Sequence, residues 1–349
     1  MSEEVASPRG RPCVLVTGAA GFTGHHMVME AARAGFRVRA TDVSSRHYGA
    51  LFDALGVDFA AADLTRREGL ERLLVDVDGV FHVAGIHDYS TPDEVIFAVN
   101  VKAVENLCEA AVAAGVGRFI HLSSVGVYGY AWRSGLPVRE DAEKLTPPLN
   151  NYNASKWEGE KVVDRYRREK GLRTTIFRPA AIYGPRSEYG LYNAFDQVYR
   201  SRRRRRVPMV GRGDRIEAFL HVEDLCRAAL FALERDGTVG EIYNVSDDSR
   251  MTTVEFFRLV SRELLGAAKP FLHLPLRLLL PVAALSQRLA GWLHRRPALE
   301  VGTLHYLSYD RCWDTSKLKA TGFELAHPSA EEGLRETLRW YRENGWFRP

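Results

Sequence analysis

One stretch decides the fold of this chain: Cys13-Val14-Leu15-Val16-Thr17-Gly18-Ala19-Ala20-Gly21-Phe22-Thr23-Gly24. A short apolar run ends at a glycine, two more glycines follow at three-residue intervals, and a helical pattern begins at once. This order predicts a strand, a tight turn and a helix. Gly18 permits the sharp exit from the strand, Gly21 lets the backbone approach a ligand, and Gly24 lets the helix pack on the strand. The helix N-terminus then suits a pyrophosphate, although a glycine-rich turn without a ligand stays open at this point.

The composition bounds the class of protein. With 349 residues, of which 46% are hydrophobic, the chain can bury one large core or two smaller ones. A net charge of +4 is too small to indicate a nucleic-acid partner. The polar residues 1–12 predict a flexible N-terminus and no signal peptide. Widely spaced cysteines indicate neither a disulfide framework nor a zinc site, and they favour a reducing, cytoplasmic compartment: Cys13, Cys108, Cys226 and Cys312.

Strands and helices alternate after the glycine turn. Further strands are predicted at 36–42, 57–64, 79–85, 118–124 and 174–179, and helices at 26–34, 66–74, 92–114 and 150–170. This alternation predicts an α/β fold with a Rossmann-type, doubly wound parallel sheet, whose ligands lie beyond the carboxyl ends of the strands. We assign 13–186 to a dinucleotide-binding domain and 187–349 mainly to a smaller substrate-binding region, with about 214–245 returning to the first domain. The long polar loop 125–149 is predicted to border the site.

Asp42 ends the second predicted strand, 24 residues after Gly18. A dinucleotide fold places a carboxylate near this point to bind the adenosine ribose. Such a carboxylate accepts from the 2′-OH and repels a 2′-phosphate, which favours NAD over NADP, although Arg46 nearby weakens the preference. An aspartate that only closes a turn is the alternative.

Tyr152 and Lys156 lie four residues apart in a predicted helix, so both side chains share one face. The lysine ammonium favours the phenolate form of the tyrosine, which can then exchange a proton with an alcohol or a carbonyl. Such proton transfer contributes roughly 10²–10⁴ in rate. Ser124, at the end of a predicted strand, can donate a hydrogen bond to the same oxygen. A nicotinamide beside these groups would complete the parts needed for hydride transfer.

Five motifs lie along the chain: Thr17–Gly24 as TGxxGxxG, Asp63-Leu64, the set Ser124, Tyr152 and Lys156, Arg178–Pro185 as RPxxxYGP, and His221–Ala228 as HVxDxxxA. Together they resemble the extended short-chain dehydrogenase/reductases, and the resemblance covers nearly the whole chain. It implies an NAD(P)-dependent enzyme acting on CH–OH groups, with Ser124, Tyr152 and Lys156 catalytic and no metal. It also implies NAD contacts at Gly18, Gly21, Phe22, Thr23, Gly24, Asp42, Asp63, Leu64, Ala84, Tyr152, Lys156 and Pro179.

Two departures from the family pattern bear on the substrate. Val125 follows Ser124 where the family's dehydratases carry an Asp-Glu pair, which argues against dehydration. Glu217 stands where nucleotide-sugar epimerases often place an arginine that binds the diphosphate. A carboxylate there would repel a diphosphate, although Arg212 or Arg215 could compensate.

The segment 271–293 is very apolar and interrupted by prolines. It resembles the 3β-hydroxysteroid dehydrogenase branch, which includes decarboxylating sterol-4-carboxylate 3-dehydrogenases. Two readings stay open: core helices, or a lid over a lipophilic substrate that also touches a membrane surface. The arginine run 202–206 is likewise either a solvated helix end or a contact with anionic lipid.

We therefore expect an NAD-dependent oxidoreductase that interconverts a secondary alcohol and a ketone on a lipophilic, sterol-like substrate, with decarboxylation where a 4-carboxylate is present. The resemblance also implies a homodimer. A nucleotide-sugar epimerase or reductase is the alternative on the same fold. A non-catalytic, dinucleotide-binding redox sensor is the alternative from another class.

Overall fold

The computed structural model describes residues 11–88, 91–129, 137–142, 144, 148, 150–293, 299 and 301–347. Most of the predicted flexible N-terminus 1–12 and part of the predicted loop 125–149 lie outside these residues. Within them, a parallel sheet of seven strands runs in the order β11-β6-β5-β4-β1-β2-β3. Its strands are β1 (Cys13–Thr17), β2 (Arg37–Asp42), β3 (Asp58–Ala61), β4 (Gly79–His82), β5 (Arg118–Leu122), β6 (Thr174–Pro179) and β11 (Ile242–Val245). The predicted Rossmann-type α/β fold is confirmed.

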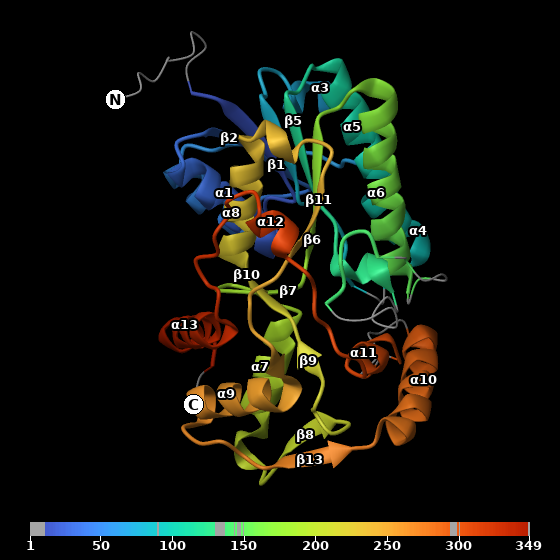
Figure 1. The fold of residues 1–349 in the computed structure, drawn as a ribbon, viewed down its shortest axis with the longest axis vertical. Helices are drawn as coiled ribbons and strands as arrows, with labels where there is room; N and C mark the ends of the chain where they lie inside the picture. The colour runs from blue at the N-terminus through green and yellow to red at the C-terminus, as the bar shows by residue number, and fades with distance from the viewer. Residues whose placement is uncertain are drawn as a thin grey trace.

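Helices cover both faces of this sheet (Figure 1). On one face α1 (Phe22–Arg33) and α8 (Val222–Leu233) bury apolar residues against the strands. On the other face α5 (Ala103–Ala113) and α6 (Asn151–Lys170) do the same. The fold thus has three layers, with a core on each side of the sheet.

Several predicted elements differ in length from the observed ones. The helix predicted at 66–74 shrinks to α3 (Leu70–Leu73), because Gly69 takes a φ of 83° just before it. The helix predicted at 92–114 is divided into α4 (Asp93–Phe97), a π-helical turn at Ala98–Lys102, and α5. The third, fourth and fifth predicted strands also end two to three residues early, so the residues that follow them leave the ladder at the carboxyl edge of the sheet.

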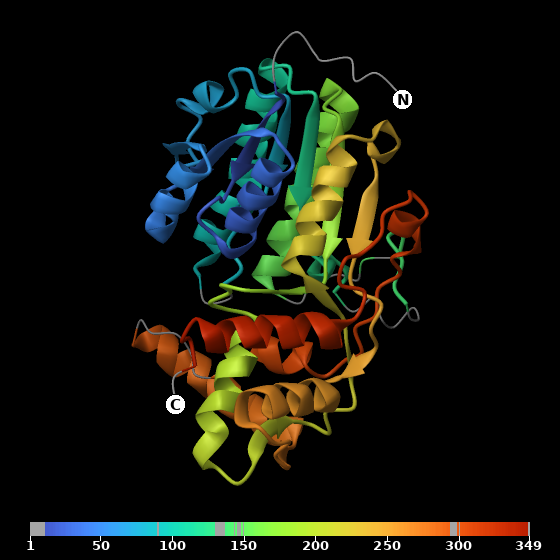
Figure 2. The ribbon, with the colours of Figure 1, turned by 90° about the vertical axis from the view of Figure 1, so that its left-hand side faces the viewer.

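A second group of elements lies beyond that edge (Figure 2). Helices pack there around their own apolar cluster, among them α7 (Leu191–Arg200), α9 (Thr253–Leu265) and α13 (Ala330–Glu343). Short strand pairs accompany them: β7 (Ala181–Tyr183) with β10 (Phe219–His221), β9 (Ile216–Glu217) with β12 (Met251–Thr252), and β8 (Val207–Val210) with β13 (Phe271–Leu274). The remaining helices are α2 (Gly49–Ala54), α10 (Leu276–Trp292), α11 (Val301–Tyr306) and α12 (Ser316–Lys319).

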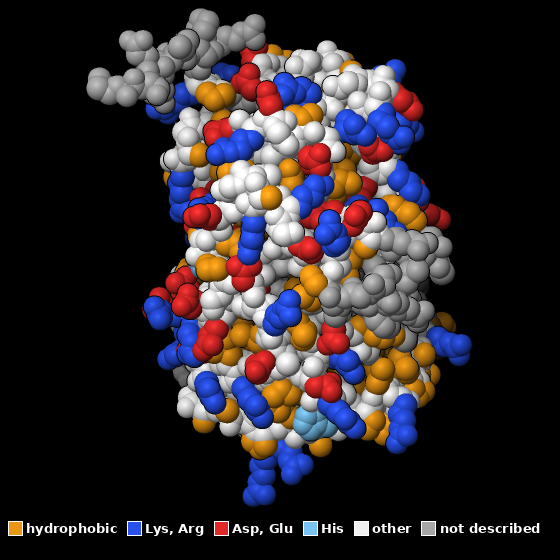
Figure 3. Space-filling model, viewed as in Figure 1, with side chains coloured by type: hydrophobic (Ala, Val, Ile, Leu, Met, Phe, Trp, Pro, Cys, Tyr) orange, Lys and Arg blue, Asp and Glu red, His pale blue; other side chains and the backbone are white. Residues whose placement is uncertain are grey.

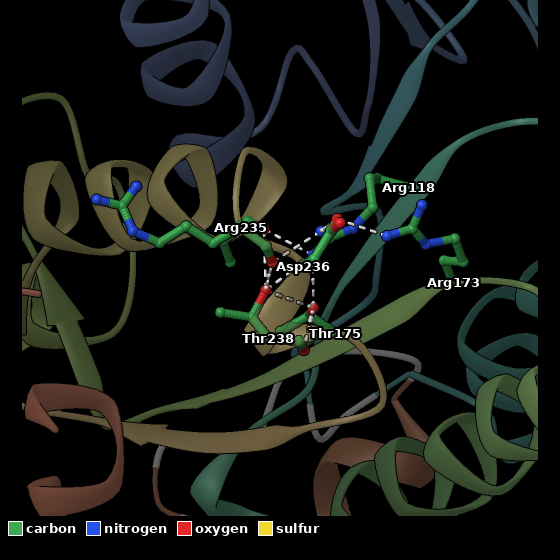
Figure 4. A network of polar contacts seen from close by, with 7 residues as sticks. Arg118, Arg173, Thr175, Arg235, Asp236 and Thr238 are labelled. Atoms are coloured by element: carbon green, nitrogen blue, oxygen red, sulfur yellow. Dashed lines mark hydrogen bonds and ion pairs between the residues drawn. The ribbon is translucent and has the colours of Figure 1, made fainter. Parts of the chain in front are cut away.

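A buried arginine binds several groups at the amino ends of the strands, opposite the carboxyl ends (Figure 4). Arg118, the first residue of β5, donates to the carbonyl oxygens of Ala232 at 2.6 Å and Arg235 at 2.8 Å. It also donates to the hydroxyls of Thr238 at 2.8 Å and Thr175 at 3.2 Å. One guanidinium therefore satisfies the end of α8 and joins it to β5 and β6, far from the carboxyl ends where the candidate site lies.

Candidate functional site

The glycine turn after β1 has the geometry that its sequence predicts. Gly18 has a φ of 64°, and a Cβ there would lie 2.7 Å from the Cα of Ala84. A Cβ on Gly24 would overlap the carbonyl oxygen of Gly18. Gly21 is the N-cap of α1, with no side chain capping the first turn of that helix. The first N–H groups of α1 are thus available to an anion, and the turn fits the pyrophosphate of a dinucleotide.

Asp42 closes this turn from the side of β2. Its Oδ2 accepts from the N–H of Ala20 at 3.0 Å, and its Oδ1 accepts from the N–H of Val43 at 2.7 Å. The carboxylate is half-buried. A carboxylate held in this way lies at the carboxyl end of the neighbouring strand, where the adenosine ribose is predicted to bind.

The other predicted adenine and pyrophosphate contacts follow the same edge of the sheet. The Asp63 carboxylate accepts from the hydroxyl of Thr65 at 2.7 Å and from its N–H at 3.0 Å, and these bonds lower the pKa of Asp63. Leu64 and Phe22 bury their side chains in the two cores, while Thr23 lies in the first turn of α1. The N–H of Ala84 donates to the hydroxyl of Thr17 at 3.2 Å.

Tyr152 and Lys156 lie on the inner face of α6, at the end of β5. Both are at least nine-tenths buried, with 8% and 7% of their surface exposed. The Lys156 ammonium donates to the carbonyl oxygen of Leu122 at 2.7 Å. Burial lowers the pKa of Lys156 to about 8, against the opposing charge of Glu160. A Cβ on Gly85 would lie 3.2 Å from Lys156 Nζ and from Asn100 Oδ1, so a larger residue there would press on both side chains.

The two serines that end the fifth predicted strand have different surroundings. Ser123 is buried and donates to Glu160 Oε1 at 2.6 Å. Ser124 is the N-cap of a single helical turn, and its hydroxyl accepts from the N–H of Gly126 at 3.0 Å. Gly126 packs closely against both Ser124 Oγ and Asn153, the residue after Tyr152. The structure therefore places Ser124 beside the start of α6 and gives Ser123 a structural partner.

Asn100 is a positioning residue that the sequence analysis did not identify. It lies in the π-helical turn and donates to Ser155 Oγ at 2.9 Å and to the carbonyl oxygen of Ile86 at 3.0 Å, while accepting from the N–H of Ile86 at 2.8 Å. Asn100 thus ties the segment after β4 to the helix that carries Tyr152. A π-helical turn often marks a functional site, but nothing in the sequence pattern distinguishes it from a regular helix.

Arg178 of the RPxxxYGP motif is fully buried and forms a bidentate ion pair with Glu160, at 2.8 and 2.7 Å. It also donates to the hydroxyl of Tyr128 at 2.8 Å. These bonds join β6 to α6 four residues beyond Lys156. Pro179 ends β6, where the resemblance implies a contact with the nicotinamide carboxamide.

Glu217 does not present an unpaired charge. Its carboxylate accepts from the Nε of Arg311 at 3.1 Å and from the hydroxyl of Thr253 at 3.1 Å, and a second contact with the Arg311 guanidinium makes the pair bidentate. Both side chains are buried, and the N–H of Arg311 donates to the carbonyl oxygen of Ile216 in β9. Of the two arginines that could compensate, Arg215 forms an ion pair with Asp310 at 3.3 Å. Arg212 is exposed and forms no ion pair with a carboxylate among the described residues.

Three further side chains meet at the start of α8. Nitrogen and oxygen ligand atoms of His221, Glu223 and His327 lie within 4.8 Å of one another, a set that could hold a metal ion and that the sequence analysis did not identify. The two nitrogens of His327 also face Asp224 at 3.5 Å and Glu336 at 3.4 Å. Asp224 accordingly raises the pKa of His327.

Fold and site together define a nicotinamide-dependent enzyme acting on CH–OH groups, of the extended short-chain dehydrogenase/reductase type. Residues 14–246 match the model of the NAD dependent epimerase/dehydratase family. The chain belongs to this family.

Relatives of similar identity differ in what they act on. A 3beta-hydroxysteroid-dehydrogenase/decarboxylase of Arabidopsis thaliana is 28% identical, over 94% of this chain and 79% of its own length. An N-acetyl-alpha-D-glucosaminyl-diphospho-ditrans,octacis-undecaprenol 4-epimerase of Escherichia coli O157:H7 is 26% identical, over 94% of both chains. A solved UDP-glucose 4-epimerase of Thermotoga maritima with UDP-glucose superposes with a TM-score of 0.75 at 26% identity, covering 95% of this chain and 99% of that one. Family membership therefore leaves the substrate open.

Proposed function

We propose that this enzyme interconverts a secondary alcohol and a ketone on a lipophilic, sterol-like substrate, with NAD as its cofactor. The observation that carries the choice of substrate is the buried ion pair between Glu217 and Arg311. A nucleotide sugar brings a diphosphate, which needs unpaired cations. Arg311 and Arg215 are instead neutralised by carboxylates of the same chain. A sterol brings no diphosphate and therefore requires no such group of cations.

In this proposal Tyr152 takes the hydroxyl proton of the alcohol during oxidation and returns a proton to the carbonyl oxygen during reduction. The Lys156 ammonium favours the tyrosinate and donates to the nicotinamide ribose, while the Ser124 hydroxyl orients the reacting oxygen. When bound, the nicotinamide accepts the hydrogen and electron pair of the alcohol carbon, or supplies them to the ketone. The burial of Tyr152 and Lys156 excludes bulk water from the proton transfer.

NAD is favoured over NADP because Asp42 would meet the 2′ position of the ribose with a negative charge. The glycine turn would hold the pyrophosphate against the first N–H groups of α1. The rest of the cofactor-binding site would be lined by Asp63, Leu64, Ala84 and Pro179.

A substrate with a carboxylate beta to the new ketone would lose CO₂ without a further catalytic group. The carbon–carbon bond to the carboxylate breaks, and its electron pair enters the ketone as an enolate, which a proton then quenches. The Ser124 hydroxyl could stabilise that enolate oxygen.

The decisive experiment incubates the purified enzyme with NAD and either a 3β-hydroxysterol, with and without a 4-carboxylate, or UDP-galactose. We expect sterol-dependent NADH formation. Formation of an epimeric UDP-sugar without net NADH would overturn the proposal in favour of an epimerase. If Tyr152→Phe binds NAD normally and neither it nor the wild-type enzyme turns over any substrate, the redox sensor gains support.

We also propose that the enzyme is a homodimer joined through the helices around Asn100 and Tyr152, as the family resemblance implies. Analytical ultracentrifugation tests this proposal, and a monomeric mass at micromolar concentration would refute it. Because a lipophilic substrate partitions into membranes, we propose in addition a peripheral contact with a membrane surface.

A further inference from the structure

Helix α10 exposes apolar side chains to an unusual degree. Seven of the large exposed hydrophobic residues of the described chain lie in β13, in α10 or at the C-cap of α10: Leu272 (44% exposed), Leu278 (61%), Val282 (56%), Leu285 (58%), Leu289 (49%), Trp292 (81%) and Leu293 (53%). Figure 3 shows apolar side chains gathered over α10. Such a concentration on one element marks an interaction surface, because soluble surfaces usually carry apolar residues singly.

The exposed residues of α10 form one stripe. Leu278, Val282, Leu285, Leu289 and Trp292 follow one another at intervals of four, three, four and three residues. At about 100° per residue they fall within an arc of about 80°. These residues therefore form one continuous face along nearly the whole length of α10.

The opposite side of α10 holds the helix on the protein. Ala283 is fully buried and Ala290 is 7% exposed, and α10 packs against α11. The half-buried leucines Leu276, Leu279 and Leu280 lie on this side too, so α10 has one apolar face toward the protein and a second one toward solvent. The interpretation of 271–293 as core helices explains why Ala283 and Ala290 are buried. It does not explain why the apolar stripe is exposed.

A basic surface adjoins this stripe. Arg277 and Arg288 are exposed on α10, and the stretch 264–293 contains no acidic residue. The arginine run 202–206 is exposed and forms no ion pair with a carboxylate in the part of the chain that the structure describes. In Figure 3 basic side chains project from the lower end of the molecule, where α7 leads into β8.

The arginine run and α10 belong to one structural unit. The run leads directly into β8, which pairs in parallel with β13, the strand immediately before α10. Lys269 locks this junction, because its ammonium donates to the carbonyl oxygens of Ser201 at 3.0 Å, Arg202 at 2.6 Å and Arg204 at 2.9 Å. The cations are therefore held at a fixed place beside Lys269, one short strand away from the start of α10.

We propose that α10 and the arginine run 202–206 form a docking surface for an anionic lipid bilayer, with the stripe inserted among the acyl chains and the arginines on the headgroups. The inference rests on the membrane contact proposed above and names its location and its lipid. Apolar insertion and attraction to anionic headgroups each contribute to such binding. In the chain described here, no helix combines the length and apolar character needed to cross a bilayer, which is consistent with a contact that lies along the surface.

A bilayer fits this surface better than a second copy of the chain. A two-fold dimer through this face would bring the arginines of both copies into one interface, and the stretch 264–293 offers no acidic residue to neutralise them. An anionic bilayer instead supplies both an apolar interior and the opposite charge. Trp292, at the end of the stripe, is a residue type enriched at membrane interfaces.

The test is co-sedimentation of the full chain with phosphatidylcholine vesicles, with and without phosphatidylserine. We expect binding to the vesicles that contain phosphatidylserine, weakened by added salt. Leu285→Glu/Leu289→Glu should lower the partition coefficient about tenfold or more, and Arg203→Glu/Arg205→Glu should do the same on the anionic vesicles.

Matched controls carry the same changes elsewhere on the surface. Leu55→Glu/Val75→Glu replaces exposed apolar residues, and Arg37→Glu/Arg72→Glu replaces exposed cations on β2 and α3. Both controls should bind as the wild type does. Absence of binding to either vesicle, or equal loss in the controls, would overturn the proposal, as would a dimer that Leu285→Glu/Leu289→Glu converts to a monomer. Because the assay contains neither substrate nor cofactor, its outcome is independent of whether the sterol reaction is found.

Discussion

The Lys156 ammonium donates a 2.7 Å hydrogen bond to the carbonyl oxygen of Leu122, the last residue of β5. This bond joins α6, the helix that carries Tyr152, to the point where β5 ends and the loop with Ser124 begins. It holds the lysine among buried groups, which explains why burial lowers its pKa to about 8. The strand end thus determines where the charge beside Tyr152 lies.

Ser124→Ala and Ser123→Ala should separate a catalytic role from a structural one. Ser124→Ala should lower kcat by about tenfold to a hundredfold, because the reacting oxygen loses a hydrogen-bond donor. Ser123→Ala should leave kcat within about twofold. It should lower the free energy of unfolding by about 1–2 kcal/mol, because the Ser123 hydroxyl donates a buried hydrogen bond to Glu160. Steady-state kinetics and urea unfolding of both variants check this. Equal effects of the two changes on kcat would remove Ser124 from the proposed mechanism.

Asp42→Asn should narrow the preference for NAD over NADP by about tenfold, which corresponds to about 1.4 kcal/mol. Asparagine keeps an acceptor for the Ala20 N–H but removes the charge that repels a 2′-phosphate. Asp42→Ala should remove the same charge and also weaken the binding of both cofactors, because the Ala20 N–H in the glycine turn loses its acceptor. Titration of the two cofactors by intrinsic fluorescence gives the ratio. Tighter binding of NADP by the wild-type enzyme would refute the assignment.

Glu217→Gln should give the enzyme measurable affinity for UDP, because it leaves the buried Arg311 cation for an anion to neutralise. The change should also cost about 3–5 kcal/mol of stability in the absence of ligand. Added UDP should raise the Tm of the variant and leave the wild type unchanged. The double variant Glu217→Gln/Arg311→Gln is the control and should lose the response. A wild-type enzyme that already binds UDP tightly would contradict the proposed substrate class.

Arg118→Met should lower the free energy of unfolding by about 2–4 kcal/mol, because carbonyl oxygens at the end of α8 lose their buried donor. Arg173→Met is the matched control. Its ion pair with Asp236 is largely exposed, with 48% and 88% of the two side chains accessible, and its removal should cost less than about 1 kcal/mol. Urea titration of both variants measures the difference. Similar losses would mean that the surface ion pair supports this edge of the sheet.

Stability should decline as the pH falls below about 6.5. Burial lowers the pKa of His25, His82 and His221 to about 3 and that of His26 to about 4, and it also lowers the pKa of His121. Below pH 6.5 the unfolded chain therefore binds more protons than the folded one, and acid favours unfolding until the folded pKa values are reached.

Protonation of His327 has the opposite effect and stabilises the folded chain. Asp224 raises its pKa, so its contribution to stability is present below the unfolded value and fades as the pH rises through the folded one. Urea midpoints between about pH 7.5 and about pH 5 should show the net decline. His121→Leu should flatten this dependence, because it removes a buried imidazole. A midpoint independent of pH over this range would contradict the prediction.

Local patterns predicted the frame of the site. The glycine spacing predicted the turn, and Gly171, with a φ of 71°, ends α6 directly after the predicted helix 150–170. Asn150 caps the same helix through a 2.8 Å bond to the N–H of Asn153. These features depend on residues a few positions apart, so a single sequence contains the information for them.

Partners distant in sequence were not predictable in the same way. Glu217 and Arg311 are 94 residues apart, and only the folded chain shows that the carboxylate is neutralised rather than facing a ligand. The π-helical turn around Asn100 likewise has no signal in the apolar periodicity. The exposed stripe of α10 has the same period as a buried one, so the sequence pattern alone left open which side faced outward.

The pairing of Glu217 with Arg311 also bears on how easily the specificity of this enzyme could evolve. A glutamate codon becomes a glutamine codon by one base change, and that change alone would leave a buried guanidinium without its counterion. The enzyme encoded by a duplicated gene could therefore gain affinity for diphosphate-bearing substrates through a single mutation, provided that the fold tolerates the lost ion pair. The stability held in the two cores and in the Arg118 network would then limit which copies survive that step.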